Sequence, residues 1–232
     1  MPRYGVMVLG VLAALVCGRL GLWQLDRLDQ RRAVNASIEA GLAAPPLSAE
    51  SVWSATNETA ATLGYRRVRL RGRWDLDRQI LVVARSLNGV PGVHVVTPLR
   101  SPEEDGPALL VERGWAPSPD GRSVDLAALA ELEDAEVSGV LMAPRGGDTT
   151  LSREWPVRLR TADPSSMAPR YPYRLAPLIL RRDTAMAGMR AVPLPERTDG
   201  PHLSYAVQWF AFGVIAVVGS AVLALKKDGG GW

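Results

Sequence analysis

Two long apolar segments lie near the ends of the 232-residue chain. No formal charge occurs between Tyr205 and Leu225, a run of 21 residues. At about 1.5 Å of rise per residue, a helix of that length crosses a hydrocarbon core of about 30 Å. Residues 4–18 are likewise uncharged, and the apolar pattern continues past Arg19, which lies close enough to one end to reach the headgroups. We therefore predict transmembrane helices at residues 4–25 and 205–225.

The first apolar segment is predicted to be an uncleaved anchor. It is longer than the apolar part of an ordinary signal peptide, and no Ala-x-Ala sequence precedes the charges that begin at Asp26. A lipoprotein signal needs a small residue before Cys17, where Val16 stands. Only three residues precede the apolar run, too few for an Arg-rich and Ser-rich transit peptide, so we expect a bacterial plasma membrane rather than a mitochondrial one.

Two spans place both termini on one side of the membrane and residues 26–204 on the other. Basic residues flank both ends of the spans, and long domains translocate largely regardless of charge. The charge pattern alone therefore leaves the side open.

Between the spans, the hydrophobic period changes from helix to strand. The first helix is predicted to continue to residue 40 and to end before Pro45-Pro46. From Tyr65, apolar positions alternate with arginines as far as Trp74, which predicts a half-buried strand with a basic outer face. Further strands, bounded by Gly, Pro, Asn or Asp, are predicted at residues 79–84, 92–99, 108–113, 135–141 and 175–180. Short helices are predicted at residues 124–132 and 164–168. Residues 26–204 thus form one α+β domain, mostly antiparallel β.

Composition limits the chemistry of this domain. The formal net charge is +3, and the acidic and basic residues are interspersed, which indicates a solvated surface with mild attraction to anionic headgroups and no nucleic-acid partner. The single cysteine excludes an intramolecular disulfide, and two histidines exclude a multi-histidine zinc site within one chain.

No catalytic motif is present in the sequence. There is no Gly-x-Ser-x-Gly, no phosphate-binding glycine loop with lysine and no His-Glu-x-x-His. Asp75-x-Asp77 lacks the rest of a calcium loop and is interpreted as a polar turn. His94 lies within a predicted strand and is interpreted as a half-buried structural histidine. We expect that the chain is not an enzyme.

Five segments stand out in order along the chain: Gly21-Leu22-Trp23-Gln24-Leu25-Asp26-Arg27, Tyr65-Arg66-Arg67-Val68, Gly92-Val93-His94-Val95-Val96-Thr97-Pro98-Leu99, Val111-Glu112-Arg113-Gly114-Trp115-Ala116-Pro117 and His202-Leu203-Ser204-Tyr205-Ala206-Val207-Gln208-Trp209-Phe210. Together they resemble the Surfeit locus protein 1 family of cytochrome c oxidase assembly factors. The chain departs from the family at Arg31, where a lysine is usual. Residues around 146–160 could not be matched.

The resemblance implies a bacterial plasma-membrane assembly factor for haem-copper cytochrome c oxidase. Both termini would be cytoplasmic and the central domain periplasmic. The implied partners are the oxidase catalytic subunit, the haem a synthesis enzymes and the lipid bilayer. The implied cofactor is haem a, which bacterial members are proposed to pass to that subunit.

His202 is then the candidate axial ligand, because neutral imidazole suits haem iron. On a helix, Tyr205 and Trp209 lie on the same face as His202. Gln24 and Gln208 lie near the outer ends of the spans and either bond each other or hold a haem propionate. The candidate cofactor-binding residues are Trp23, Gln24, His202, Tyr205, Gln208 and Trp209.

Two alternatives to haem handling stay open. The aromatic residues also match a membrane-interface belt, and His202 could cap its helix or bind a headgroup, as expected of a scaffold that steadies an oxidase intermediate without haem. An unrelated membrane-anchored enzyme would instead need a periplasmic pocket with convergent acid and base groups.

Overall fold

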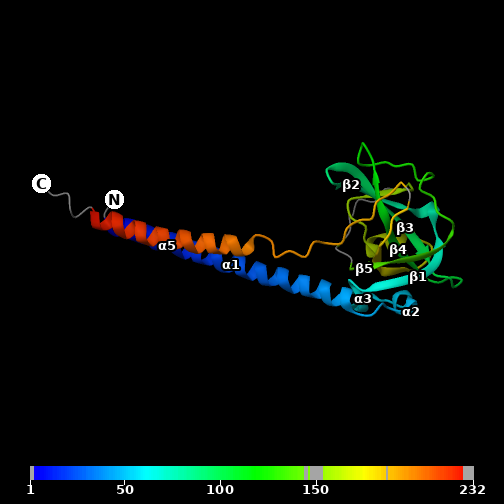
Figure 1. Cartoon of the computed structure of the whole chain (residues 1–232), viewed down its shortest axis with the longest axis horizontal. Coiled ribbons are helices and arrows are strands. Elements are labelled where there is room, and N and C mark those ends of the chain that lie inside the picture. Colours follow the sequence, from blue (N-terminus) through cyan, green and yellow to red (C-terminus); the bar gives the residue numbers. More distant parts are fainter. Residues whose placement is uncertain (1–2, 144–145, 147–153, 187, 227–232) are drawn as a thin grey trace. The chain divides into compact units, whose positions relative to one another are not determined.

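The computed structural model describes residues 3–143, 146, 154–186 and 188–226. Its elements are shown in Figure 1. The chain divides into two compact units. One joins the residues up to Ser37 to those from Glu196 onward, and the other comprises Ile38–Pro195.

The first unit is built on two long helices, α1 (Arg3–Ala43) and α5 (His202–Lys226). Both are long and apolar enough to cross a membrane, and only 11% and 17% of their most apolar windows are buried. Apolar side chains left uncovered on this scale are expected of helices that face lipid, so the two helices suggest a membrane anchor. The extension of α1 beyond residue 25 is confirmed, and Pro45 and Pro46 follow its end.

Helices α1 and α5 pack antiparallel and close together (Figure 1). A Cβ atom on Gly10 would lie 2.1 Å from the Ser220 hydroxyl, and one on Gly21 would lie 2.6 Å from the Phe210 ring. A side chain at Gly10 would also crowd the Ala216 carbonyl at 2.8 Å, and one at Gly21 would displace the Phe210 ring, so both glycines permit the close contact. Such small-residue contacts are typical of helices that pair within lipid.

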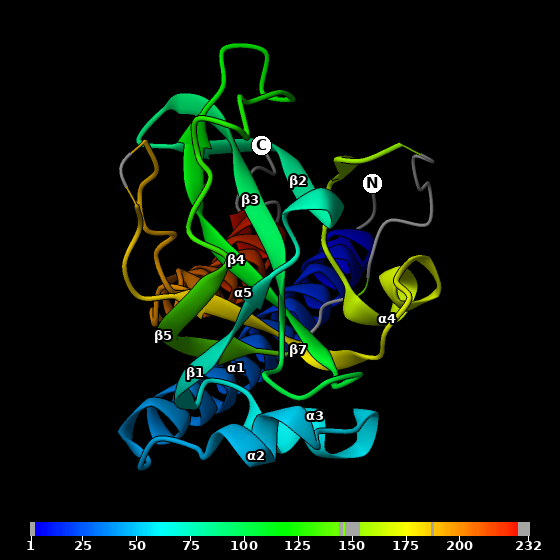
Figure 2. The ribbon, with the colours of Figure 1, turned by 90° about the vertical axis from the view of Figure 1, so that its right-hand side faces the viewer.

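The second unit contains a seven-stranded sheet in the order β1-β5-β7-β4-β3-β2-β6. The strands are β1 (Arg67–Trp74), β2 (Ile80–Leu87), β3 (Val90–Arg100), β4 (Ala108–Pro117), β5 (Asp134–Met142), β6 (Val157–Leu159) and β7 (Leu175–Arg182). Pairing is antiparallel except between β4 and β7 and between β2 and β6, which confirms the predicted, mostly antiparallel sheet. Because β1 also pairs with β3, the sheet curls into a partly closed barrel (Figure 2).

Three short helices accompany the sheet: α2 (Ala49–Trp53), α3 (Asn57–Leu63) and α4 (Pro164–Met167). The first two were not predicted; their buried Val52 and Ala60 join the core formed by β1, β4, β5 and β7. The predicted helix at residues 164–168 is confirmed as α4, where the Asp163 carboxylate accepts from the Ser166 amide. One-turn 3₁₀ helices lie between β1 and β2, at Leu76–Arg78, and after α4, at Ala168–Arg170.

The helix predicted at residues 124–132 is wrong, because this segment forms turns. Asp125 accepts hydrogen bonds from the amides of Ala127 and Ala128, as an N-terminal helix cap does. The chain then turns away, and the Leu129 carbonyl and the Glu131 carboxylate bind the buried guanidinium of Arg113. The hydrogen bonds made to Arg113 therefore outweigh the local preference of residues 124–132 for a helix.

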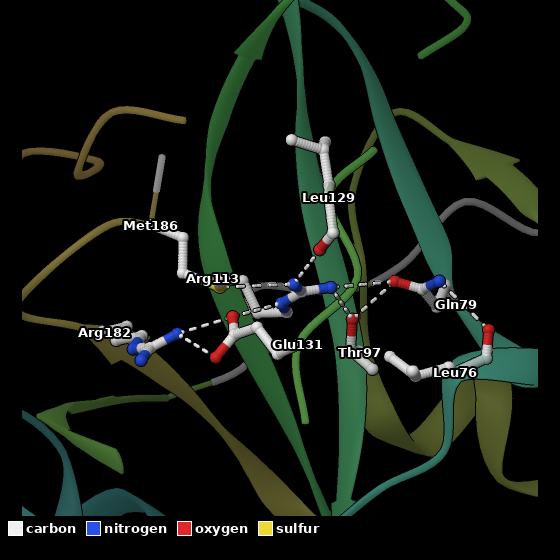
Figure 3. Close-up of polar contacts among 8 residues, drawn as sticks. All are labelled: Leu76, Gln79, Thr97, Arg113, Leu129, Glu131, Arg182 and Met186. Carbon is white, nitrogen blue, oxygen red and sulfur yellow. Dashed lines mark hydrogen bonds and ion pairs between the residues drawn. The ribbon is translucent and has the colours of Figure 1, made fainter. Parts of the chain in front are cut away.

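Arg113 on β4 is the centre of a buried polar network (Figure 3). Arg113 is only 1% exposed. Its guanidinium donates to Glu131 at 2.9 Å, to Gln79 at 3.2 Å and to the Leu129 carbonyl. Glu131 also accepts from Arg182 of β7 at 2.7 Å. Burial lowers the pKa of Arg113, and the Glu131 carboxylate opposes this shift. The network joins β4, β7 and the 124–132 segment within one core.

Replacing Arg113 by methionine is expected to destabilise the protein by about 3 kcal/mol or more, because buried acceptors lose their donor. Denaturant unfolding of the full chain in detergent, followed by tryptophan fluorescence, measures this loss. The matched control is Arg73→Met on β1, whose ion pair with Glu133 is well exposed and should contribute at most about 1 kcal/mol. Equal effects of the two substitutions would contradict a central role of Arg113.

Candidate functional site

A polar pair lies where α5 begins against α1. His202 Nδ1 and Gln24 Oε1 are 2.9 Å apart, and both side chains are partly buried. Gln24 is one turn beyond Gly21, and His202 is two turns before Phe210, the residue that packs on Gly21. The close helix contact therefore sets the register that brings the imidazole to the amide.

This hydrogen bond determines which ring nitrogen of His202 carries the proton. An amide oxygen only accepts, so Nδ1 donates, and of the two neutral tautomers only the one with its lone pair on Nε2 allows this bond. Among the described residues, Nε2 has no hydrogen-bond partner. A Cβ atom on the neighbouring Gly200 would lie 3.7 Å from Nε2, so the glycine leaves this side of the ring open. A neutral imidazole held through Nδ1, with a bare Nε2, is the usual state of a histidine that ligates a metal.

The chain leading into His202 is tied to the continuation of α1. Arg31 Nε and Asn35 Nδ2 each donate to the Thr198 carbonyl at 3.1 Å. Arg32 Nε bonds Asp199 at 3.0 Å. Arg31, the position at which the chain departs from the family pattern, thus engages backbone, and its guanidinium also reaches the Glu196 carbonyl at 3.4 Å. These contacts fix the direction from which the chain enters α5.

In the described part of the chain, none of the four other predicted site residues hydrogen-bonds to this pair. Trp23 and Tyr205 are 47% and 46% exposed. Trp209 is half-buried and meets Phe212 edge to face, with ring centroids 6.0 Å apart. Gln208 is exposed. Of the two amides predicted to bond each other or a propionate, Gln24 binds His202 instead of Gln208.

A second polar cluster lies inside the sheet domain. His94 Nδ1 on β3 and Glu112 on β4 are 2.5 Å apart, and Arg181 on β7 donates to the other oxygen of Glu112 at 2.5 Å. The three side chains line a pocket of about 210 Å³. Burial alone raises the pKa of Glu112, but the hydrogen bond with His94 and the charge of Arg181 outweigh it, so the pKa lies below the ordinary 4.5. Glu112 is therefore a carboxylate that ties three strands together.

Sequence reasoning missed the partner of His202 and the role of Gly200. The signal for the first was the spacing of Gly10 and Gly21 in the first span, since small residues on one face predict a packing seam. The signal for the second was a glycine two residues before the motif histidine, and its φ of +66° is one that glycine adopts without strain.

In the sequence, two close-packed apolar helices precede and follow a largely antiparallel α+β domain. This order of elements defines the class of the protein as an α+β domain with an apolar helix at each end. The model of the SURF1 family matches residues 11–214, a range that includes most of α1, the whole sheet domain and the first half of α5. The chain belongs to the SURF1 family.

Its relatives span bacteria and yeast. Uncharacterized SURF1-like proteins of Mycobacterium tuberculosis and Mycobacterium bovis are 25% identical over 218 residues, which cover 90% of this chain and 78% of theirs. The cytochrome oxidase assembly protein SHY1 of Saccharomyces cerevisiae is 28% identical over 145 residues, 60% of this chain and 36% of the yeast protein. A SURF1-like protein of Rickettsia felis is 30% identical over 98 residues, 41% of this chain and 39% of its own length.

Gly21→Leu is expected to separate Gln24 from His202, because its side chain would overlap the Phe210 ring. Overpacking of this kind costs about 1–3 kcal/mol. Hydrogen exchange of the amides in residues 196–205, measured by mass spectrometry on the full chain, should accelerate by about tenfold. Gly219→Leu is the control, since a Cβ atom there meets nothing within 4 Å. Unchanged exchange in Gly21→Leu would show that this contact does not hold the pair.

The stability advantage of the wild type over Glu112→Gln should depend on pH. A carboxyl group whose pKa is lowered on folding stabilises the fold above its unfolded pKa, and this contribution is lost as the pH falls through the folded value. The advantage is therefore expected to shrink as the pH falls below about 4.5. Denaturant unfolding of both proteins between pH 7 and pH 3 measures it. A difference that does not change in acid would contradict the ion-paired carboxylate.

Proposed function

We propose that this protein is an assembly factor for haem-copper cytochrome c oxidase that holds haem a at His202 and assists its insertion into the oxidase catalytic subunit. The observation that carries the proposal is the hydrogen bond between Gln24 and His202, which leaves Nε2 bare. Support for the oxidase as target comes from membership in the SURF1 family and from similarity to the cytochrome oxidase assembly protein SHY1 of yeast.

The proposed location is a bacterial plasma membrane. Residues 4–25 and 205–225 would span it, both termini would be cytoplasmic, and residues 26–204 would lie in the periplasm. The extent and exposure of the two apolar helices support the anchoring. His202 and Gln24 would then lie at the periplasmic edge of the bilayer, where an apolar macrocycle enters most readily from lipid.

The residues present fit a haem group. His202 offers Nε2 as a ligand because Gln24 occupies Nδ1, and Gly200 leaves the approach to Nε2 open. Trp23 and Tyr205 offer exposed aromatic surface beside it. A bound haem would supply an iron that accepts one nitrogen ligand.

Within this proposal, each side chain of the pair has a distinct task. His202 holds the cofactor through Nε2, and Gln24 keeps the proton on Nδ1 and the ring in place. Loss of such an outer partner typically lowers metal affinity by about 10–100-fold. A carrier must also release its cargo. A single histidine on an open helix end suits transfer, and we propose no catalytic step for the chain.

Purification from cells that make haem a tests the proposal. The wild-type full chain should carry a haem absorption spectrum, and His202→Ala should lose it because the only proposed ligand is gone. His94→Gln is the matched control, since the chain has two histidines and the glutamine can still donate to Glu112. In Gln24→Leu, haem affinity should fall by about 10–100-fold.

The same preparation distinguishes the scaffold alternative. A protein that carries no haem but still co-purifies with the oxidase catalytic subunit would replace the carrier proposal with the scaffold. Haem retained in His202→Ala would contradict His202 as the ligand.

A further inference from the structure

An apolar groove runs along the seam between α1 and α5. It has a volume of about 420 Å³, within the range of small-molecule sites. Ala14 and Gly18 line it from α1, and Phe210, Gly213, Val217 and Val218 line it from α5. None of these side chains carries a polar group, so the groove suits a hydrocarbon ligand.

Small residues of both helices, Ala14 and Gly18 on α1 and Gly213 on α5, leave space for the groove. A Cβ atom on Gly18 would meet nothing within 4 Å, in contrast to Gly10 and Gly21 on the same helix, where it would overlap α5. Gly18 is therefore not required for helix packing. Its missing side chain leaves space that lies outside the contact between the helices.

The groove begins at Phe210, two turns along α5 from His202. Its first lining residue on α5, Phe210, packs on Gly21, which lies one turn from Gln24. At about 1.5 Å per residue, Phe210 lies about 12 Å along α5 from His202 and Val218 lies about 24 Å from it. A ligand bound at His202 with a long apolar tail would place that tail in the groove.

We propose that this groove binds the isoprenoid tail of the haem held at His202, so that the protein selects tailed haems over tailless ones. The inference rests on the proposed function. The proposed occupant is the tail, because only a tail joined to the haem would link occupancy of the groove to His202. A free lipid chain would fill the groove without affecting that site. The protein would then bind two parts of the haem, the iron through His202 and the tail through the groove at Gly18.

Haem o and haem b provide the probe, because they differ only in that haem o carries the hydroxyethylfarnesyl tail. The full chain in phosphatidylcholine nanodiscs is titrated with each haem, and binding is followed by absorbance. Wild type is expected to bind haem o about tenfold more tightly than haem b, since contacts of even one apolar group in a fitted pocket discriminate to this degree.

Gly18→Leu should reduce this ratio to about one by filling the groove, and Gly18→Ala should give a smaller reduction. Gly219→Leu is the matched control, because it adds the same side chain to open space on α5 outside the groove lining. It should keep the wild-type ratio. Circular dichroism verifies that each variant retains its helices.

Equal affinity of the wild type for the two haems would overturn the tail groove while leaving haem binding at His202 intact, as would a ratio unchanged in Gly18→Leu. Equal affinity would also indicate that membrane lipid fills the groove. Binding of neither haem would overturn the proposed function, and the tail groove with it.

Discussion

The close approach of α1 and α5 is the constraint on which the candidate site depends. Gly10 and Gly21 permit it, because a side chain at either position would overlap the opposite helix. Once the backbones meet there, the register is fixed and Gln24 faces His202. The polar pair is thus a consequence of apolar packing. The same seam leaves the Gly18 groove open, since its glycine is free of contacts where the others are not.

The sheet domain uses its motif residues differently. Glu112 joins β4 to His94 of β3 and to Arg181 of β7, and the adjacent Arg113 joins β4 to Glu131 on the opposite side of the strand. Neighbouring residues on a strand point to opposite faces, so one short motif ties both sides of the sheet. The polar residues of this motif are therefore accounted for by cohesion of the domain, whereas Nε2 of His202, at the start of α5, has no hydrogen-bond partner among the residues that the structure describes.

Much of the fold could be predicted because period and length are local signals. The long helices and the strand at Arg67–Trp74 follow from them. Short helices such as α2 are too brief to show a period, and they are stabilised by packing of Val52 in the core. Residues 124–132 have a helical pattern, but they form turns because the Leu129 carbonyl accepts a hydrogen bond from the buried Arg113. His202 and Gln24 could be chosen as site residues from sequence, but their hydrogen bond could not, because it requires the register between two helices.

The candidate site depends on Gln24 accepting a hydrogen bond from Nδ1 of His202, which leaves Nε2 as the nitrogen that can ligate a metal. Nitrogen-15 NMR of the histidine side chains in the full chain, assigned with His94→Gln, tests this most directly, because the two ring nitrogens of each tautomer have distinct shifts. The account predicts a proton on Nδ1 of His202 in the wild type, a mixture of tautomers in Gln24→Leu, and a shifted Nε2 when haem is added. A proton on Nε2 in the wild type, unaffected by the loss of Gln24, would contradict it.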